Sequence, residues 1–203
     1  MKYTFLVDTY ESERLKTLNV WSMFTDADLT VRPHPTLARD RNALEHMMHQ
    51  CLSEDKWFRT MFGIDLGTPP LPIQENRLEL IKHYAADSGK RVAILQAKDK
   101  AWWEAEVAFF DAIHSRAWIM VRRIAHTAHH RGELTTLLRL LGREVHSVYG
   151  PAVDTGGLPA NTAATIYAYP DISALIEGES QGGRKTPLPG PGEKSSTERP
   201  DRK

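Results

Sequence analysis

The stretch Ile124-Ala-His-Thr-Ala-His-His-Arg-Gly-Glu-Leu134 decides how this chain is organised. It lies inside a longer segment, residues 116–141, whose charged and apolar side chains alternate as on a helix. Ser115 can cap the start of that helix, and Gly142 is a stop signal at its end. We therefore predict one long helix over residues 116–141.

A pair of histidines on this helix predicts a metal site. His126 and His130 are four residues apart, so a helix places them on one face with Cβ atoms about 5–6 Å apart. Two imidazoles so placed can converge on one ion at Zn–N distances of roughly 2.0–2.1 Å. Glu133 projects from the same stripe, whereas His129 points about 100° away and is expected to lie on the surface or behind the site. The spacing alone also fits core histidines satisfied by hydrogen bonds.

The rest of the chain extends the helical pattern in both directions. Apolar residues recur at helical spacing in three further segments, and Pro-rich connections separate them. The expected helices cover about 5–24, 37–61 and 74–97, with Gly89 a candidate kink and Gly63 the end of the second. Residues 101–113 are expected to be irregular or extended, 159–167 a short helix and 172–176 one more turn. The fold class is therefore all-α, an antiparallel bundle of helices with short irregular insertions and a C-terminal extension.

The C-terminal extension differs in composition from the rest. From Gly178 onward the chain is rich in Gly, Ser, Pro and charge, so it can bury little apolar area against its ordering entropy. We expect a helical bundle domain over residues 1–177 and a disordered polar tail over 178–203.

Composition excludes several classes of partner. The 26 basic and 26 acidic residues cancel, so nothing indicates a nucleic-acid or anionic-membrane partner. No apolar run approaches the roughly 18–20 residues that span a bilayer, and the N-terminus becomes charged at Asp8 before a signal-peptide core develops. A lone cysteine, Cys51, fits a reducing compartment. A cytoplasmic protein with no membrane or nucleic-acid partner is expected.

A third metal ligand has to come from another helix. Both His46 and His49 lie in the segment 37–61, three residues apart, so they cannot point in quite the same direction. Spacing leaves the choice between them open.

Three motifs give the chain a resemblance to the DinB/YfiT-like superfamily of bacterial metalloproteins, over about residues 5–155. They are His49-Gln-Cys-Leu-Ser-Glu-Asp-Lys-Trp57, His126-Thr-Ala-His-His-Arg-Gly-Glu133, and Leu137-Leu-Arg-Leu-Leu-Gly142 followed by Tyr149-Gly-Pro151. The second resembles the HxxxHRGQ-type motif of that superfamily, with Glu133 where Gln is frequent.

The resemblance implies a four-helix bundle of up-down-down-up topology that holds one divalent metal ion, nickel or zinc, on three histidines. Counted back from Glu54, it selects His49 over His46 as the partner of His126 and His130. It also implies a homodimer and a small-molecule substrate, a low-molecular-weight thiol among the candidates. We accordingly expect a metal-dependent hydrolase or thiol S-transferase, with Glu133 as general base or as support for a ligand. A non-catalytic metal-binding protein in a stress-response or regulatory role is the alternative.

Overall fold

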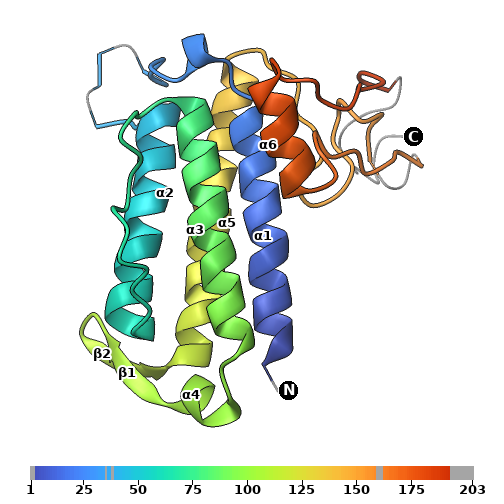
Figure 1. Ribbon diagram of the computed structural model, residues 1–203. Coiled ribbons are helices and arrows are strands. Elements are labelled where there is room, and N and C mark those ends of the chain that lie inside the picture. The colour runs from blue at the N-terminus through green and yellow to red at the C-terminus, as the bar shows by residue number, and fades with distance from the viewer. Residues whose placement is uncertain (1–2, 35, 38, 159–161, 193–203) are drawn as a thin grey trace, which may run out of the picture.

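Four long helices that lie side by side dominate the computed structural model, which describes residues 3–34, 36–37, 39–158 and 162–192 (Figure 1). Two of them, α1 and α5, run in one direction, and α2 and α3 run in the other. Their bounds are α1 Thr4–Ser22, α2 Ala43–Trp57, α3 Arg77–Gln96 and α5 Arg116–Leu140. The chain is mainly helical, which confirms the all-α prediction.

The helices pack around a core that divides into two clusters. Helix α1 packs against α3 and α5, while α2 packs against α5 and, less extensively, α3. One cluster includes Trp21 and Leu138, and the other includes Phe58 and Trp103 near the opposite end of the bundle. Each fully buried side chain of this size contributes roughly 1.5–3 kcal/mol. The interface between α2 and α5 is thereby fixed from both ends.

Helix α2 begins later than the sequence pattern predicted. Asn42 caps it by accepting from the backbone N–H of Glu45, whose carboxylate in turn accepts from the backbone N–H of Asn42. This reciprocal capping box satisfies two free donors at once, so the start predicted at residue 37 was wrong. The helix continues as a π turn, η2, over Phe58–Phe62 and ends at Gly63, which has φ +65°.

Helix α3 runs through Gly89 without a break. A Cβ there would lie 3.1 Å from Nη2 of Arg14, so that guanidinium would have to move by a few tenths of an ångström. That guanidinium crosses from α1 to donate to the Ala85 carbonyl and the Ser88 hydroxyl. The glycine expected to be a kink is therefore a point of close approach between α1 and α3.

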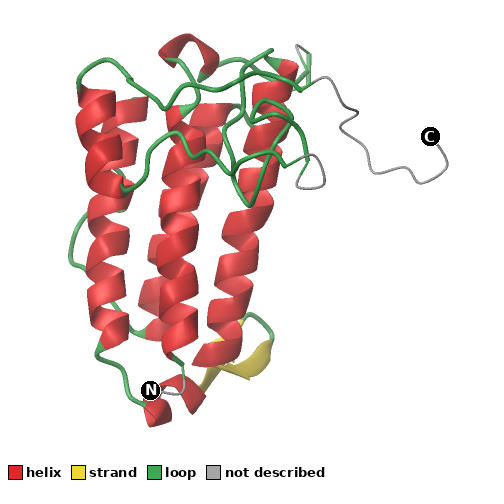
Figure 2. Ribbon diagram, turned by 90° about the vertical axis from the view of Figure 1, so that its right-hand side faces the viewer, coloured by secondary structure: helices red, strands yellow, loops and turns green. Residues whose placement is uncertain are grey.

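A short helix and a hairpin join α3 to α5 at one end of the bundle (Figure 2). The helix is α4, Lys100–Glu104, and the antiparallel strands are β1, Glu106–Phe109, and β2, Ala112–Ser115. An extended passage was predicted here. Ser115 then accepts from the backbone N–H of Trp118, which confirms the predicted cap of α5.

The chain after α5 departs most from the prediction. No helix forms over residues 162–167 of the predicted 159–167, and 159–161 lie outside the described residues. The backbone there bonds to distant loops instead, since Ser147 N–H donates to the Ile166 carbonyl and Ile166 N–H to the Ser147 hydroxyl. The turn predicted at 172–176 is a longer helix, α6, Ile172–Ser180, which packs on α1 and α3.

The segment predicted as a disordered tail is described as far as residue 192. Lys185 Nζ lies 3.0 Å from Oε1 of buried Glu179, and Thr186 N–H donates to the Ala168 carbonyl. These residues contact the helical domain, contrary to the expectation of disorder from residue 178. Residues 193–203 lie outside the described ranges, and the division at 177 stays a prediction. None of the helices in the described part of the chain is long and apolar enough to span a membrane.

Candidate metal centre

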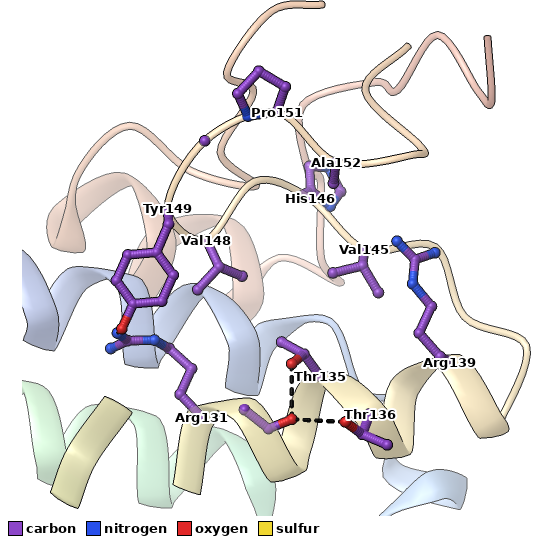
Figure 3. A pocket seen from close by; sticks show the side chains of 12 residues that line it. Arg131, Thr135, Thr136, Arg139, Val145, His146, Val148, Tyr149, Pro151 and Ala152 are labelled. Carbon is purple, nitrogen blue, oxygen red and sulfur yellow. Dashed lines mark hydrogen bonds between the residues drawn. The ribbon is translucent and has the colours of Figure 1, made fainter. Parts of the chain in front are cut away.

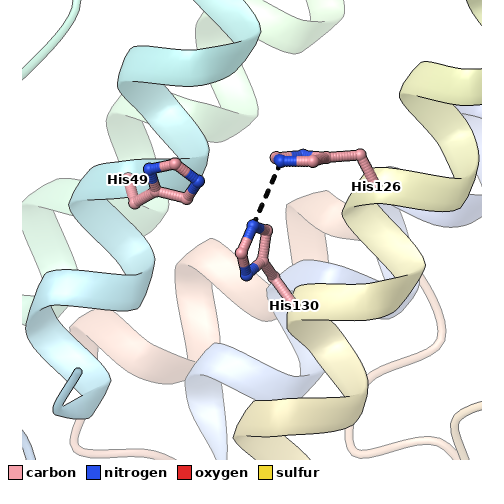
Figure 4. A group of neighbouring side chains, drawn as sticks. All are labelled: His49, His126 and His130. Carbon is pink, nitrogen blue, oxygen red and sulfur yellow. Dashed lines mark hydrogen bonds between the residues drawn. The ribbon is translucent and has the colours of Figure 1, made fainter. Parts of the chain in front are cut away.

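Three histidines face one another across the interface of α2 and α5 (Figure 4). His49 comes from α2, and His126 and His130 come from successive turns of α5. One ring nitrogen of each lies within 4.8 Å of the others. Nε2 of His126 and Nε2 of His130 are 3.2 Å apart, close to the edge of about 3.3 Å that a tetrahedral zinc site with its usual Zn–N distances would have. The three side chains therefore fit a divalent ion.

The environment keeps these imidazoles neutral. Burial, with a smaller contribution from Arg41, lowers the pKa of His49 to about 4. Burial, followed by the charge of Arg123, lowers the pKa of His126 to about 3. The pKa of His130 is also lowered, chiefly by burial. Neutral rings have a free lone pair at physiological pH, which is the state a metal requires.

Glu133 supports one ligand from behind. Its Oε2 lies 2.6 Å from Nδ1 of His130. A proton held at that Nδ1 leaves the Nε2 lone pair facing His126, which is how carboxylates orient metal-binding histidines. Burial by itself would raise the pKa of Glu133, but the hydrogen bond from His130 and the nearby His46 lower it. The residue expected to be catalytic thus contacts a ligand, and its role as a base stays a prediction.

His46 belongs to a second, overlapping group with His130 and Glu133. Its Nδ1 lies 3.7 Å from Oε2 of Glu133. Because Nδ1 of His130 already meets that carboxylate, an ion in this group would displace the hydrogen bond. The bond between His130 and Glu133 therefore favours the group that contains His49.

Two neighbours of the motif behave as surface residues. The side chain of His129 is 64% exposed, with Nε2 3.6 Å from Oε2 of Glu133, as expected for a residue outside the ligand set. Nothing lies within 4 Å of a Cβ placed at Gly132. The glycine therefore does not mark a close approach between helices.

Cavities flank the histidines on both sides. One of about 790 Å³ is lined by His49, His126 and Trp57, and the ring centroids of Trp57 and His126 are 5.6 Å apart. Another of about 620 Å³ is lined by His46 and Glu133. Phe109 and Phe110 of the hairpin also line the larger cavity, and so do Lys56 and Arg122. None of these four was predicted as a site residue. Only the packing of the hairpin against α2 and α5 reveals them.

Another face of α5 anchors the loop that follows it, residues 141–152 (Figure 3). Arg131 is buried, pairs with Glu13 and donates to the Thr17 hydroxyl at 3.2 Å. Its guanidinium also contacts Tyr149, beside a cavity of about 340 Å³ between α5 and the loop. Arg131 therefore links α5 to α1 and to the loop that follows α5.

Comparisons with known proteins agree with this fold. A DinB-like protein from Bacillus cereus is 22% identical, with a TM-score of 0.58 over 70% of this chain and 92% of that one. A DinB-like protein from Bacillus subtilis is 16% identical, with a TM-score of 0.54 over 69% of this chain and 94% of that one. At such identities the likeness concerns the fold alone. No curated protein matches the sequence. The model of the DinB family, however, matches residues 2–157, most of the 203 residues, and the chain therefore belongs to the DinB family.

Proposed function

We propose that this DinB family protein holds one divalent metal ion, nickel or zinc, on His49, His126 and His130 and acts with it on a small molecule. The observation that carries the proposal is the 3.2 Å approach of the two Nε2 atoms, with the opposite nitrogen of His130 held by Glu133. Three neutral histidines leave coordination positions open, as catalytic sites do and structural sites do not.

The reaction classes that suit this site are hydrolysis and thiol S-transfer. A bound ion would acidify a water or a thiol, which supplies the nucleophile at neutral pH. Glu133 holds the proton at Nδ1 of His130, and its side chain, 43% exposed, can also reach solvent as a base. The rings of Trp57 and Phe109 line the cavity on the side of His126. A low-molecular-weight thiol is the substrate class proposed for the transferase.

The proposal extends to the setting of the protein, a cytoplasmic homodimer. Exposed apolar side chains at Ile113 and Val121, 61% and 51% accessible, support an interface between two copies.

A non-catalytic metal-binding role, in stress response or regulation, is the second candidate. The second group of donors, in which His46 and Glu133 adjoin His130, favours it. An ion held by that group would take Glu133 as a ligand, so the carboxylate could no longer serve as a base.

Elemental analysis of the protein, expressed in medium replete with nickel and zinc, tests both candidates. We expect one ion per chain and its loss in His126→Ala. Circular dichroism should show the helices retained after chelation, because the two core clusters do not depend on the site. A screen of esters and of thiols with electrophiles then separates the two reaction classes from the non-catalytic role. Wild-type protein without a stoichiometric ion that behaves like His126→Ala would contradict the proposal.

A further inference from the structure

The larger cavity beside the histidines is shaped for an organic ligand. Its volume of about 790 Å³ lies within the range of roughly 300–1,000 Å³ that small-molecule sites occupy. Two of the proposed ligands, His49 and His126, line it directly. A molecule that fills it therefore reaches the metal centre.

One wall of this cavity is aromatic. The ring of Trp57 meets Phe109 with centroids 5.2 Å apart and Phe110 with centroids 6.2 Å apart. Phe110 has φ +53° and a side chain that is 72% exposed. Hairpin turns usually place Gly, Asn or Asp at positive φ, so the stability of the turn does not explain a large aromatic residue there. A ring presented to a ligand at the rim of the cavity does.

The polar part of the lining is cationic. Lys56 on α2 and Arg122 on α5 line the cavity, and among the described residues that do so none is an aspartate or a glutamate. Cations elsewhere in the chain have acidic partners: Lys82 pairs with Glu79, and Lys100 with Glu104. Lys56 and Arg122 form no such ion pair within the described part of the chain, and the guanidinium of Arg122 lies 5.9 Å from the ring of Trp118. The cavity thus offers positive charge without a counterion.

We propose that this cavity binds an aromatic carboxylate, which is the substrate class of the metal centre. The ring packs against Trp57, Phe109 and Phe110, and the carboxylate meets Lys56 and Arg122, whose charged donors suit it. The remainder of the molecule then faces His49 and His126. The assignment as substrate rests on the proposed function, whereas the binding itself does not.

Isothermal titration with matched probes tests the inference on the full chain, both metal-free and zinc-loaded. The probes are 2-naphthoate, neutral 2-naphthamide and cationic 2-naphthylmethylamine, which share one ring system. We expect naphthoate to bind roughly tenfold more tightly than naphthamide at low salt, as a charge-assisted contact implies, and the amine to bind most weakly. Phe110→Ala should weaken both naphthoate and naphthamide.

Substitution of Lys56 and Arg122 tests whether these side chains bind the carboxylate of naphthoate. Lys56→Gln/Arg122→Gln should reduce the ratio of the affinities for naphthoate and naphthamide to near unity. The control, Lys82→Gln/Lys100→Gln, removes the same charge from exposed ion pairs and should keep the ratio. The inference is overturned if naphthamide binds as tightly as naphthoate, or if the preference survives Lys56→Gln/Arg122→Gln. Metal-free protein that discriminates the probes but takes up no zinc would retain the cavity and refute the proposed function instead.

Discussion

Two clusters of polar side chains, one buried and one half-buried, lie only five residues apart along α2, at Glu54 and His49, and they are built on opposite principles. The carboxylate of Glu54 is fully buried and accepts from Tyr10 Oη at 2.6 Å, Tyr84 Oη at 2.9 Å and Arg91 Nη1 at 3.1 Å. The histidine cluster brings together ring nitrogens that carry lone pairs. Nδ1 of His126 is buried without a hydrogen-bond partner among the described residues. The Glu54 carboxylate has three donors and stabilises the fold, whereas the histidines bring together ring nitrogens that suit a ligand.

The electrostatics reinforce this difference. Burial, followed by the charge of Glu54, raises the pKa of both Tyr10 and Tyr84, so the hydroxyls stay protonated and donate. At the histidines burial acts in the other direction and removes the proton. The tyrosines around Glu54 keep their protons and use them in internal hydrogen bonds. The histidines are neutral and present lone pairs that suit a metal.

The largest effect is expected when the cluster around Glu54 is broken. Glu54→Leu leaves Arg91 buried without its main partner, and both tyrosine hydroxyls unsatisfied, which should cost about 3–5 kcal/mol of unfolding free energy. Urea unfolding of the metal-free protein measures it. Glu54→Gln keeps an acceptor and should lose less. A loss below about 1 kcal/mol in Glu54→Leu would show that the cluster is not a determinant of stability.

The opposite outcome is expected at the histidine cluster. His126→Ala should weaken zinc binding by more than about 100-fold, since losing a ligand exceeds the 10–100-fold cost of losing a supporting contact. Unfolding of the metal-free protein should hardly change, because no hydrogen bond of the fold depends on Nδ1 of His126. The matched control is His129→Ala, on the exposed side of the same turn. Equal losses of affinity in the two variants would remove His126 from the site.

A third polar cluster, which fastens α6, should make the stability of the fold depend on pH. Tyr169, Arg77 and Lys185 hold the side chain of Glu179, and although burial raises its pKa, these contacts lower it below the ordinary value of about 4.3. A lowered folded-state pKa means stability that is present above pH 4.3 and is lost as pH falls through the folded-state pKa.

Glu179→Gln reports on that cluster. It should lower the unfolding free energy at pH 7 by about 1–3 kcal/mol, the cost of a lost charged hydrogen bond. The difference from the wild type should shrink as the pH falls below 4.3, because protonation abolishes the same contacts in the wild type. Urea midpoints measured from pH 7 to pH 3 follow it. A difference that stays constant over this range would mean that the carboxylate charge is not what holds α6.

What the sequence could predict depends on whether a contact is local in the chain or joins distant segments. The pair His126 and His130 follows from helical geometry, which is local. His49 came only from the resemblance, since the convergence of its ring with the pair depends on how α2 packs against α5. The capping box of Asn42 and Glu45 was legible in the sequence and was overlooked. The helix predicted at 159–167 failed over 162–167, where backbone groups bond to loops far along the chain.

The smallest effect should separate the two overlapping histidine groups. Glu133→Gln weakens the bond that orients His130 and should reduce zinc affinity about tenfold, the lower end expected for a supporting carboxylate. His46→Ala should leave affinity nearly unchanged, because His46 lies on the Glu133 side of His130, with its Nδ1 3.7 Å from Oε2 of Glu133. Titration of both variants with zinc at one pH measures the order of effects. A reversed order, with His46→Ala the more damaging, would move the ion to His46, His130 and Glu133, the arrangement in which the carboxylate is itself a ligand.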